Sequence, residues 1–116
     1  MTSVLFVSHD ADLCAVAARV LERSGFEVRA AAHGGHALLA CVERGAFDVV
    51  VVEQTLPEGR GEAVAARLRR HCPGLLTVLM CDHAPGEPAE GVAVVRPFTA
   101  DDLIDAVQTL RRTIKR

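Results

Sequence analysis

Residues 48–57 read Asp-Val-Val-Val-Val-Glu-Gln-Thr-Leu-Pro and decide the fold. Four consecutive valines without polar alternation are typical of a strand buried on both faces, and such strands occupy the centre of parallel sheets. Open α/β sheets place their sites at the carboxyl ends of the strands. Glu53 directly follows the valines and is therefore the first candidate functional residue.

Apolar strands alternate with helical periods along the whole chain, which predicts βαβ units on a parallel sheet. The expected strands are Val4–Val7, Phe26–Ala30, the valine run, Leu75–Met80 and Val92–Val95. The expected helices are one capped by Asp10 and ending at Ser24-Gly25, one from His33-Gly34-Gly35-His36 to Gly45, one over Glu62–His71, and one from Thr99. Their inward residues are expected to be Leu13, Val16, Ala17, Val20 and Leu21; Leu38, Cys41 and Val42; Val64, Ala65 and Leu68; and Leu103, Val107, Leu110 and Ile114.

The segment between the last two strands is short. Residues 82–91 number only ten and include two prolines and two glycines, whereas a parallel crossover usually needs about a dozen residues or more. Prolines are poor interior residues of helices. We expect at most one helical turn, around Glu87 to Glu90, so the helix between the last two strands is shortened or absent.

Length and composition predict one α/β domain over residues 1–116. No apolar run is long enough for a membrane span and no signal peptide is visible. Four scattered cysteines are expected to be reduced and mostly buried, so we expect a cytoplasmic protein. A net charge of −2 and the lack of Trp and Tyr argue against nucleic-acid binding, and the basic residues near the C-terminus are interpreted as helix-end charge.

The chain resembles a response-regulator receiver domain over its whole length. The resemblance rests on the order and spacing of Val4–Val7, Gly25-Phe26-Glu27-Val28, His33-Gly34, the valine strand with Leu56-Pro57 and Gly61, and Arg96-Pro97-Phe98. It implies a doubly wound, flavodoxin-like (βα)5 fold with five parallel strands in the order 2-1-3-4-5. The helices that begin at Asp10 and Thr99 would cover one face, and those that begin at His33 and Glu62 the other.

The residues that carry the chemistry of such domains differ here. The resemblance matches Ser8 and His9 to two Mg²⁺-binding acids, Glu53 to the phosphate-accepting aspartate, Cys81 to a hydroxyl residue and Arg96 to a lysine. Ala93 matches the aromatic residue that moves on activation. Mg²⁺ prefers hard oxygen ligands, which a hydroxyl and an imidazole replace poorly. Asp10 is a nearby acid, but capping a helix is its expected role.

These differences predict a phosphorylation-independent receiver that acts as a protein-interaction or dimerisation module in bacterial signal transduction. We expect it to have no enzymatic activity, cofactor or metal, and to bind protein partners, with a homodimer as one option. The extra methylene of Glu53 would bring its carboxylate to the planar fork of Arg96, which suits bidentate pairing. The resemblance further implies a cis Arg96–Pro97 peptide.

Alternative interpretations remain open from the sequence. They are a small-ligand sensor that uses the pocket bounded by Ser8, His9, Glu53, Cys81 and Arg96, and a receiver still phosphorylated on Glu53 or His9. Metal binding by His9 with Glu53, or by His33 with His36, offers too few donors for a zinc site.

The interaction surface is expected beside the short crossover. Val92, Val94 and Ile104 are apolar residues that a missing helix would leave uncovered, and uncovered apolar patches often mark binding surfaces. The alternative is that Pro85, Pro88 and Ala89 fold over this patch.

Overall fold

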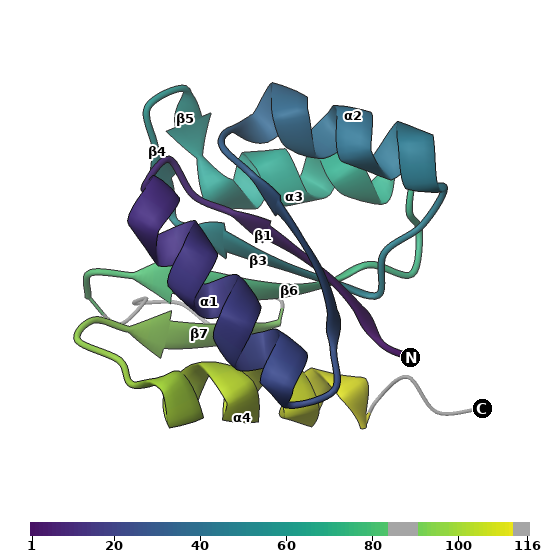
Figure 1. Ribbon diagram of the computed structural model, residues 1–116. Coiled ribbons are helices and arrows are strands. Elements are labelled where there is room, and N and C mark those ends of the chain that lie inside the picture. Colours follow the sequence, from purple (N-terminus) through teal and green to yellow (C-terminus); the bar gives the residue numbers. More distant parts are fainter. Residues whose placement is uncertain (84–90, 113–116) are drawn as a thin grey trace.

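The computed structural model describes residues 1–83 and 91–112. Its centre is a parallel sheet in the order β2-β1-β3-β6-β7, shown in Figure 1. The strands are β1 (Ser3–Val7), β2 (Glu27–Ala31), β3 (Val49–Glu53), β6 (Leu76–Cys81) and β7 (Val92–Val95). The strand order predicted from the sequence is confirmed, with the valine strand in the middle.

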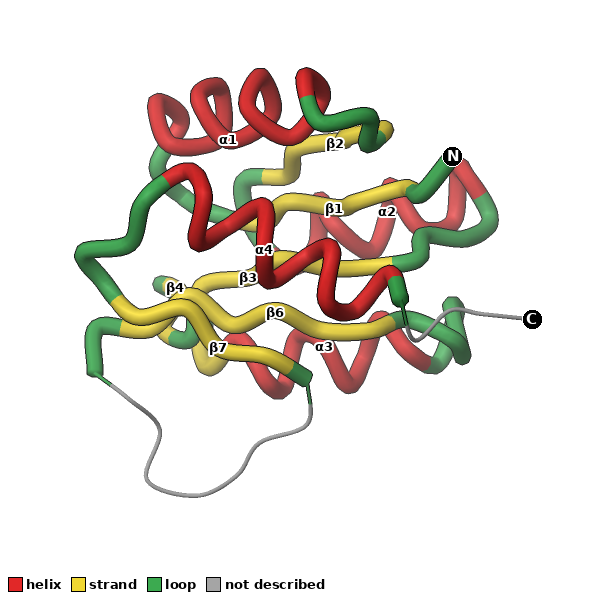
Figure 2. Tube along the Cα trace, turned by 90° about the horizontal axis from the view of Figure 1, so that it is seen from below, coloured by secondary structure: helices red, strands yellow, loops and turns green. Residues whose placement is uncertain are grey.

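In the described part of the chain, four helices lie on the two faces of the sheet. They are α1 (Ala11–Arg23), α2 (Gly34–Arg44), α3 (Gly61–Arg69) and α4 (Ala100–Arg111). Figure 2 shows α1 and α4 on one face and α2 and α3 on the other. The capping box predicted at Thr99 is present, with Thr99 Oγ1 accepting from the Asp102 N–H and Asp102 accepting from the Thr99 N–H.

The valine strand explains why both faces are covered. Val49 and Val51 pack into the core under α1 and α4, while Val50 and Val52 pack into the core under α2 and α3. All four are fully buried, and burying a valine side chain contributes about 1.5–3 kcal/mol. The strand therefore anchors Glu53 at its carboxyl end on a rigid support.

Two residues that were predicted to face the core are exposed, so the prediction is wrong for them. Val16 in α1 is 55% exposed and Val42 in α2 is 61% exposed. Cys14 and Ala40 are buried instead, because these smaller side chains are on the helix faces that approach the sheet. Ile114 lies outside the described residues.

A small antiparallel pair, which the sequence analysis did not predict, follows β3. It consists of β4 (Thr55–Leu56) and β5 (Gly59–Arg60), and α3 then begins at Gly61, one residue earlier than expected. A Cβ on Gly61 would lie 2.0 Å from the carbonyl oxygen of Glu53, so only glycine allows α3 to start against the end of β3.

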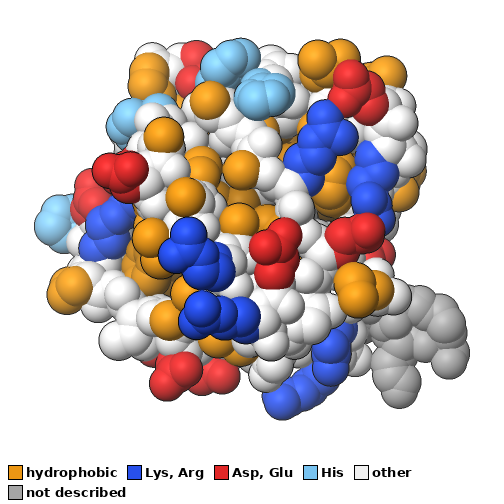
Figure 3. Space-filling view, in the orientation of Figure 1, with side chains coloured by type: hydrophobic (Ala, Val, Ile, Leu, Met, Phe, Trp, Pro, Cys, Tyr) orange, Lys and Arg blue, Asp and Glu red, His pale blue; other side chains and the backbone are white. Residues whose placement is uncertain are grey.

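The short crossover joins β6 and β7 as neighbouring parallel strands. Its expected helical turn at Glu87–Glu90 and the covering role of Pro85, Pro88 and Ala89 lie outside the described residues. Among the described helices, none has the length and apolar character that a membrane span requires. On the face shown in Figure 3, acidic and basic side chains are interspersed, which does not favour a concentrated basic field there.

Candidate functional site at the carboxyl edge of the sheet

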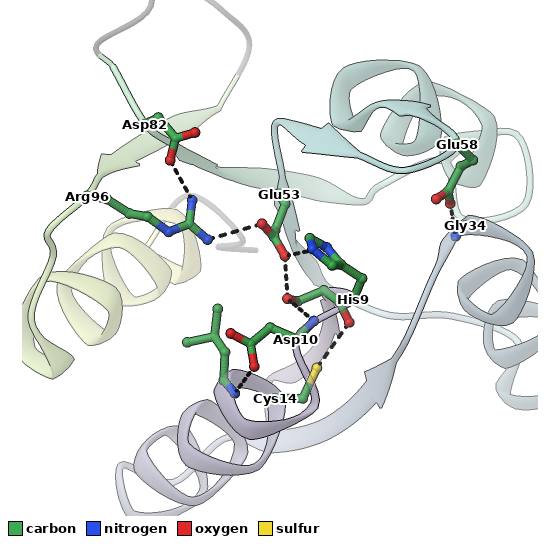
Figure 4. A network of polar contacts seen from close by, with 10 residues as sticks. His9, Asp10, Cys14, Gly34, Glu53, Glu58, Asp82 and Arg96 are labelled. Carbon is green, nitrogen blue, oxygen red and sulfur yellow. Dashed lines mark hydrogen bonds and ion pairs between the residues drawn. The ribbon is translucent and has the colours of Figure 1, made fainter.

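The carboxyl ends of the parallel strands bring the predicted site residues together. Ser8 and His9 follow β1, Glu53 ends β3, and Arg96 follows β7. Figure 4 shows the side chains of His9 and Arg96 pointing toward the carboxylate of Glu53 from two sides. We call Ser8, His9, Glu53, Asp82 and Arg96 the carboxyl-edge network.

Glu53 is the centre of this network. Its side chain is only 9% exposed, so it is not a carboxylate solvated at a strand end. Its Oε2 accepts a hydrogen bond from the Ser8 hydroxyl and lies 3.3 Å from His9 Nδ1. Its Oε1 accepts from Arg96 Nη2 at 3.1 Å. Both carboxylate oxygens are thus engaged by the protein's own side chains.

Arg96 pairs with Glu53 as predicted, and the Arg96–Pro97 peptide is cis as predicted. The bidentate geometry, however, is wrong. The second terminal nitrogen, Nη1, instead lies 3.4 Å from Asp82 Oδ1, so the guanidinium bridges two carboxylates. Sequence reasoning missed Asp82, although its place directly after β6 at the same edge of the sheet was a usable signal.

Arg96 also contacts the residue that leads into α4. Its guanidinium carbon lies 5.8 Å from the centroid of the Phe98 ring, within the range of a cation–π contact. Phe98 in turn packs against the core under α1 and α4. The guanidinium thus touches groups on three different segments of the chain.

The residues after β1 have structural partners rather than metal-binding geometry. Ser8 donates to Glu53, and its oxygen accepts from the Asp10 backbone N–H at 3.0 Å. Asp10 Oδ1 accepts from the Leu13 N–H at 3.1 Å, which confirms its predicted role as the cap of α1. Within the described residues, no group of three His, Cys, Asp or Glu side chains is arranged to hold a metal ion.

The donor set at this edge does not fit the Mg²⁺ that the resemblance implies. Mg²⁺ requires oxygen ligands in near-octahedral geometry. Here the hydroxyl of Ser8 is used as a donor, His9 offers nitrogen, and the Asp10 carboxylate serves α1. The cationic group nearest to Glu53 is Arg96, which competes with a metal ion for the same carboxylate.

Cys81 and Ala93 lie near this edge but are not part of the polar network. Cys81 is fully buried in the core under α2 and α3, and this burial raises the pKa of its thiol. A buried thiol of high pKa is a poor nucleophile, which agrees with the prediction of an inert Cys81. Ala93 is half-buried and packs against the same core, with no ring that changes position.

His33 and His36 lie away from this network, at the start of α2. His33 Nδ1 accepts from the His36 N–H and His36 Nδ1 accepts from the Ala32 N–H. Each Nδ1 lone pair is therefore occupied, and a neutral imidazole then carries its proton on Nε2. Neither ring presents a free lone pair to a metal ion in this arrangement.

Glu58 connects the β4–β5 turn to α2. Its Oε2 accepts from the Gly34 backbone N–H at the first turn of α2, as Figure 4 shows. This backbone hydrogen bond lowers the pKa of Glu58. The contact fixes the segment after Glu53 against the rest of the fold, and sequence reasoning did not anticipate it.

The predicted interaction surface needs one correction. Val94 is buried, whereas Val92 and Ile104 are half-buried and pack against the core under α1 and α4. A groove of about 340 Å³ lies between β7 and α4, with Val92, Val94, Phe98 and Ala106 among its apolar lining and Asp102 and Asp105 among its acidic lining; Ile104 is not part of this lining. We call it the β7–α4 groove. Two of the three residues predicted for the partner surface, Val92 and Val94, thus line this groove.

Comparison with known proteins identifies the fold and the family. The sequence profile of the response regulator receiver domain matches residues 4–108. The transcriptional regulatory protein TcrA of Mycobacterium tuberculosis (strain H37Rv) is 31% identical over 118 residues, which cover 94% of this chain and 46% of TcrA. The chain thus spans about half the length of the curated relatives it matches.

Solved structures agree with this assignment. A response regulator receiver protein from Sinorhizobium medicae WSM419 has a TM-score of 0.84 and 26% identity, covering 98% of this chain and 97% of that one. The chemotaxis protein CheY4 of Vibrio cholerae has a TM-score of 0.84 at 22% identity, covering 95% and 98%. The chain belongs to the response-regulator receiver domain family of two-component signalling.

Proposed function

We propose that this receiver domain works without phosphorylation, as a protein-interaction module that assembles with a second copy of itself. The observation that carries the proposal is the engagement of both Glu53 oxygens by Ser8, His9 and Arg96. Transfer of a phosphoryl group to a carboxylate depends on positioning and on a cation that neutralises the developing charge. In this network the carboxylate is already paired, and the donor set for Mg²⁺ is absent among the described residues.

The network also argues against a ligand-binding pocket at this edge. Ser8 is 1% exposed and Glu53 is buried, and their polar atoms are directed at one another and at Arg96. A small ligand would have to displace these contacts and leave buried groups unpaired, which costs about 1–3 kcal/mol for each group. We therefore favour an internal ion pair over a sensor site.

The charge pattern of α4 supports self-association. Asp101 and Asp105 are exposed near its start, and Arg112 is exposed at its end. These positions follow one stripe of the helix at spacings of four and seven residues. Two copies of α4 packed antiparallel about a twofold axis would place Asp101 of each copy opposite Arg112 of the other, as an isologous interface requires.

The apolar part of this interface is proposed to be Val92, which lines the β7–α4 groove, and Ile104, which lies on α4 outside that lining. Val94 lies two residues from Val92 on the same face of β7 and also lines the groove. Apolar contact surrounded by opposite charges is the usual anatomy of a protein interface. Receiver domains contact partner proteins in two-component systems, so an interaction role agrees with the family.

The first test concerns phosphorylation. We expect no +80 Da species by intact mass after incubation with acetyl phosphate and millimolar Mg²⁺, while a receiver that has the aspartate, treated in parallel, gains the adduct. A stable adduct that disappears in Glu53→Gln or His9→Gln would overturn the proposal. A thermal shift with nucleotides or metabolites that disappears in Arg96→Ala would favour the sensor instead.

The second test concerns assembly. We expect sedimentation to show a dimer that Ile104→Glu and Asp101→Arg each weaken. The charge-swapped double variant Asp101→Arg with Arg112→Asp should recover the dimer, because it restores opposite charges across the twofold axis. A wild-type protein that remains monomeric at high concentration would refute the homodimer.

A further inference from the structure

We propose that Arg96, held by Glu53, positions Phe98 and thereby sets the shape of the β7–α4 groove. Phe98 would then perform the coupling for which Ala93 has no side chain. This inference extends the proposed function by naming how the carboxyl-edge network controls the interaction surface. Phe98 is a positioning residue in this scheme, and it takes no part in any reaction.

The connection is continuous in space. Glu53 Oε1 lies 3.1 Å from Arg96 Nη2, and the guanidinium lies 5.8 Å from the centroid of the Phe98 ring. Phe98 is itself part of the lining of the β7–α4 groove. One side chain therefore touches both the buried carboxylate and the aromatic wall of the groove.

The orientation of the guanidinium depends on two anions. Nη2 pairs with Glu53 and Nη1 with Asp82, which is 73% exposed at its side chain. The buried partner is the stronger constraint because exposed ion pairs contribute little. Removing the charge of Glu53 should leave Arg96 to Asp82 and to solvent, and the guanidinium should then leave the Phe98 ring.

Phe98 can respond because it is only half-buried. Its ring packs against the core on one side and borders the groove on the other. The other three phenylalanines, Phe6, Phe26 and Phe47, are at most 4% exposed. A change in the position of Arg96 should therefore alter the surroundings of the Phe98 ring and leave those of the other three phenylalanine rings unchanged.

Arginine is required for this arrangement. Its planar fork reaches two carboxylates at once and also stacks on an aromatic face. A lysine is a compact point charge that can serve one carboxylate at a time. Arg96→Lys keeps the charge, so it tests the geometry separately from the electrostatics.

The chain allows a direct measurement, since it contains four phenylalanines and no Trp or Tyr. We would label it with 4-fluorophenylalanine, record ¹⁹F spectra, and assign the Phe98 signal as the one lost in Phe98→Leu. Glu53→Gln should shift the Phe98 signal more than the other three, and Arg96→Lys should shift it in the same direction. The matched control is Glu43→Gln, which removes the remote surface pair Arg29–Glu43 and should leave Phe98 unchanged.

A Phe98 signal that moves no further in Glu53→Gln than in Glu43→Gln would overturn the inference. The assembly measurement adds an independent check. Glu53→Gln and Phe98→Leu should each weaken the dimer. Because both substitutions act through the same ring, the dimer of the double variant should be no weaker than that of Phe98→Leu alone. Additive losses of dimer stability would contradict the inference. If the wild type is monomeric, the proposed homodimer fails while the ¹⁹F shift still decides whether Arg96 positions Phe98.

Discussion

The coupling between Glu53 and Arg96 can be measured by a double-mutant cycle. The perturbations are Glu53→Gln, Arg96→Ala and the two together. At 3.1 Å, two unit charges attract by about 5 kcal/mol at an effective dielectric constant of about 20. This gross value is reduced because the arginine side chain is 35% exposed and shares its charge with Asp82.

A net coupling of about 1–2 kcal/mol remains after this reduction. It lies at the lower end of the range for hydrogen bonds to charged groups, about 1.5–3 kcal/mol, and above exposed pairs, for which about 0.2–1 kcal/mol is usual. The buried glutamate is the reason, because a side chain that is 9% exposed is weakly screened by water. Glu53→Gln alone should cost about 1 kcal/mol more than the coupling, because the buried Ser8 hydroxyl loses its anionic acceptor.

The assay is urea unfolding followed by circular dichroism, since the chain has no Trp or Tyr to report by fluorescence. Equal denaturant slopes among the variants would show that the denatured states are comparable. The matched control is the cycle on Arg29 and Glu43, whose nitrogen and oxygen are closer, 2.6 Å, while the side chains are 44% and 51% exposed. A coupling at Glu53–Arg96 no larger than at this surface pair would refute the argument from burial.

Three further predictions follow from other parts of the fold. Gly61→Ala should destabilise the domain by about 2 kcal/mol or more in the same urea assay, because the new Cβ meets the Glu53 carbonyl oxygen; Gly74→Ala, which has open space around it, should be nearly neutral. The stabilising contribution of Glu58 should be fully present above its ordinary pKa of 4.5 and be lost as pH falls through its lower folded-state pKa. The unfolding free energies of the wild type and Glu58→Gln should therefore converge at acid pH. A difference that stays constant with pH would contradict this. Native protein at pH 8 should react slowly with a thiol reagent, because burial raises the pKa of Cys14 and Cys81 and raises that of Cys41 to about 12; one fast-reacting thiol without denaturant would disprove it.

The part of the fold predicted best from the sequence is the part set by strong periodic signals. The valine run fixed the central strand, and parallel strand ends necessarily share one edge of the sheet. The resemblance matches Glu53 and Arg96 to two site positions at this edge, and it was on this basis that they were predicted to meet although they are 43 positions apart. The helix cap at Asp10 could be predicted equally well, because it depends on a local hydrogen bond.

The errors have physical causes of two kinds. In α2 the run Leu38, Leu39 and Val42 is apolar on more than one side, and the small residues Ala37 and Ala40 decide which side approaches the sheet. Hydrophobic periodicity alone does not take the size of the side chains into account. The β4–β5 pair has two residues in each strand, which is too short for any alternating pattern to be recognised.

The substitutions in the carboxyl-edge network are best understood as one set. Glu53 Oε2 is hydrogen-bonded to Ser8, so an acid at position 8 would bring two carboxylates into contact, and like charges at that distance require a cation or a retained proton. Serine removes this conflict and donates to Glu53 instead. The longer side chain at position 53 reaches Arg96, and the guanidinium at position 96 reaches Asp82 as well. Together these residues give a buried carboxylate whose charge is compensated from within the chain. These mutually dependent contacts support the proposal that the domain works without phosphorylation.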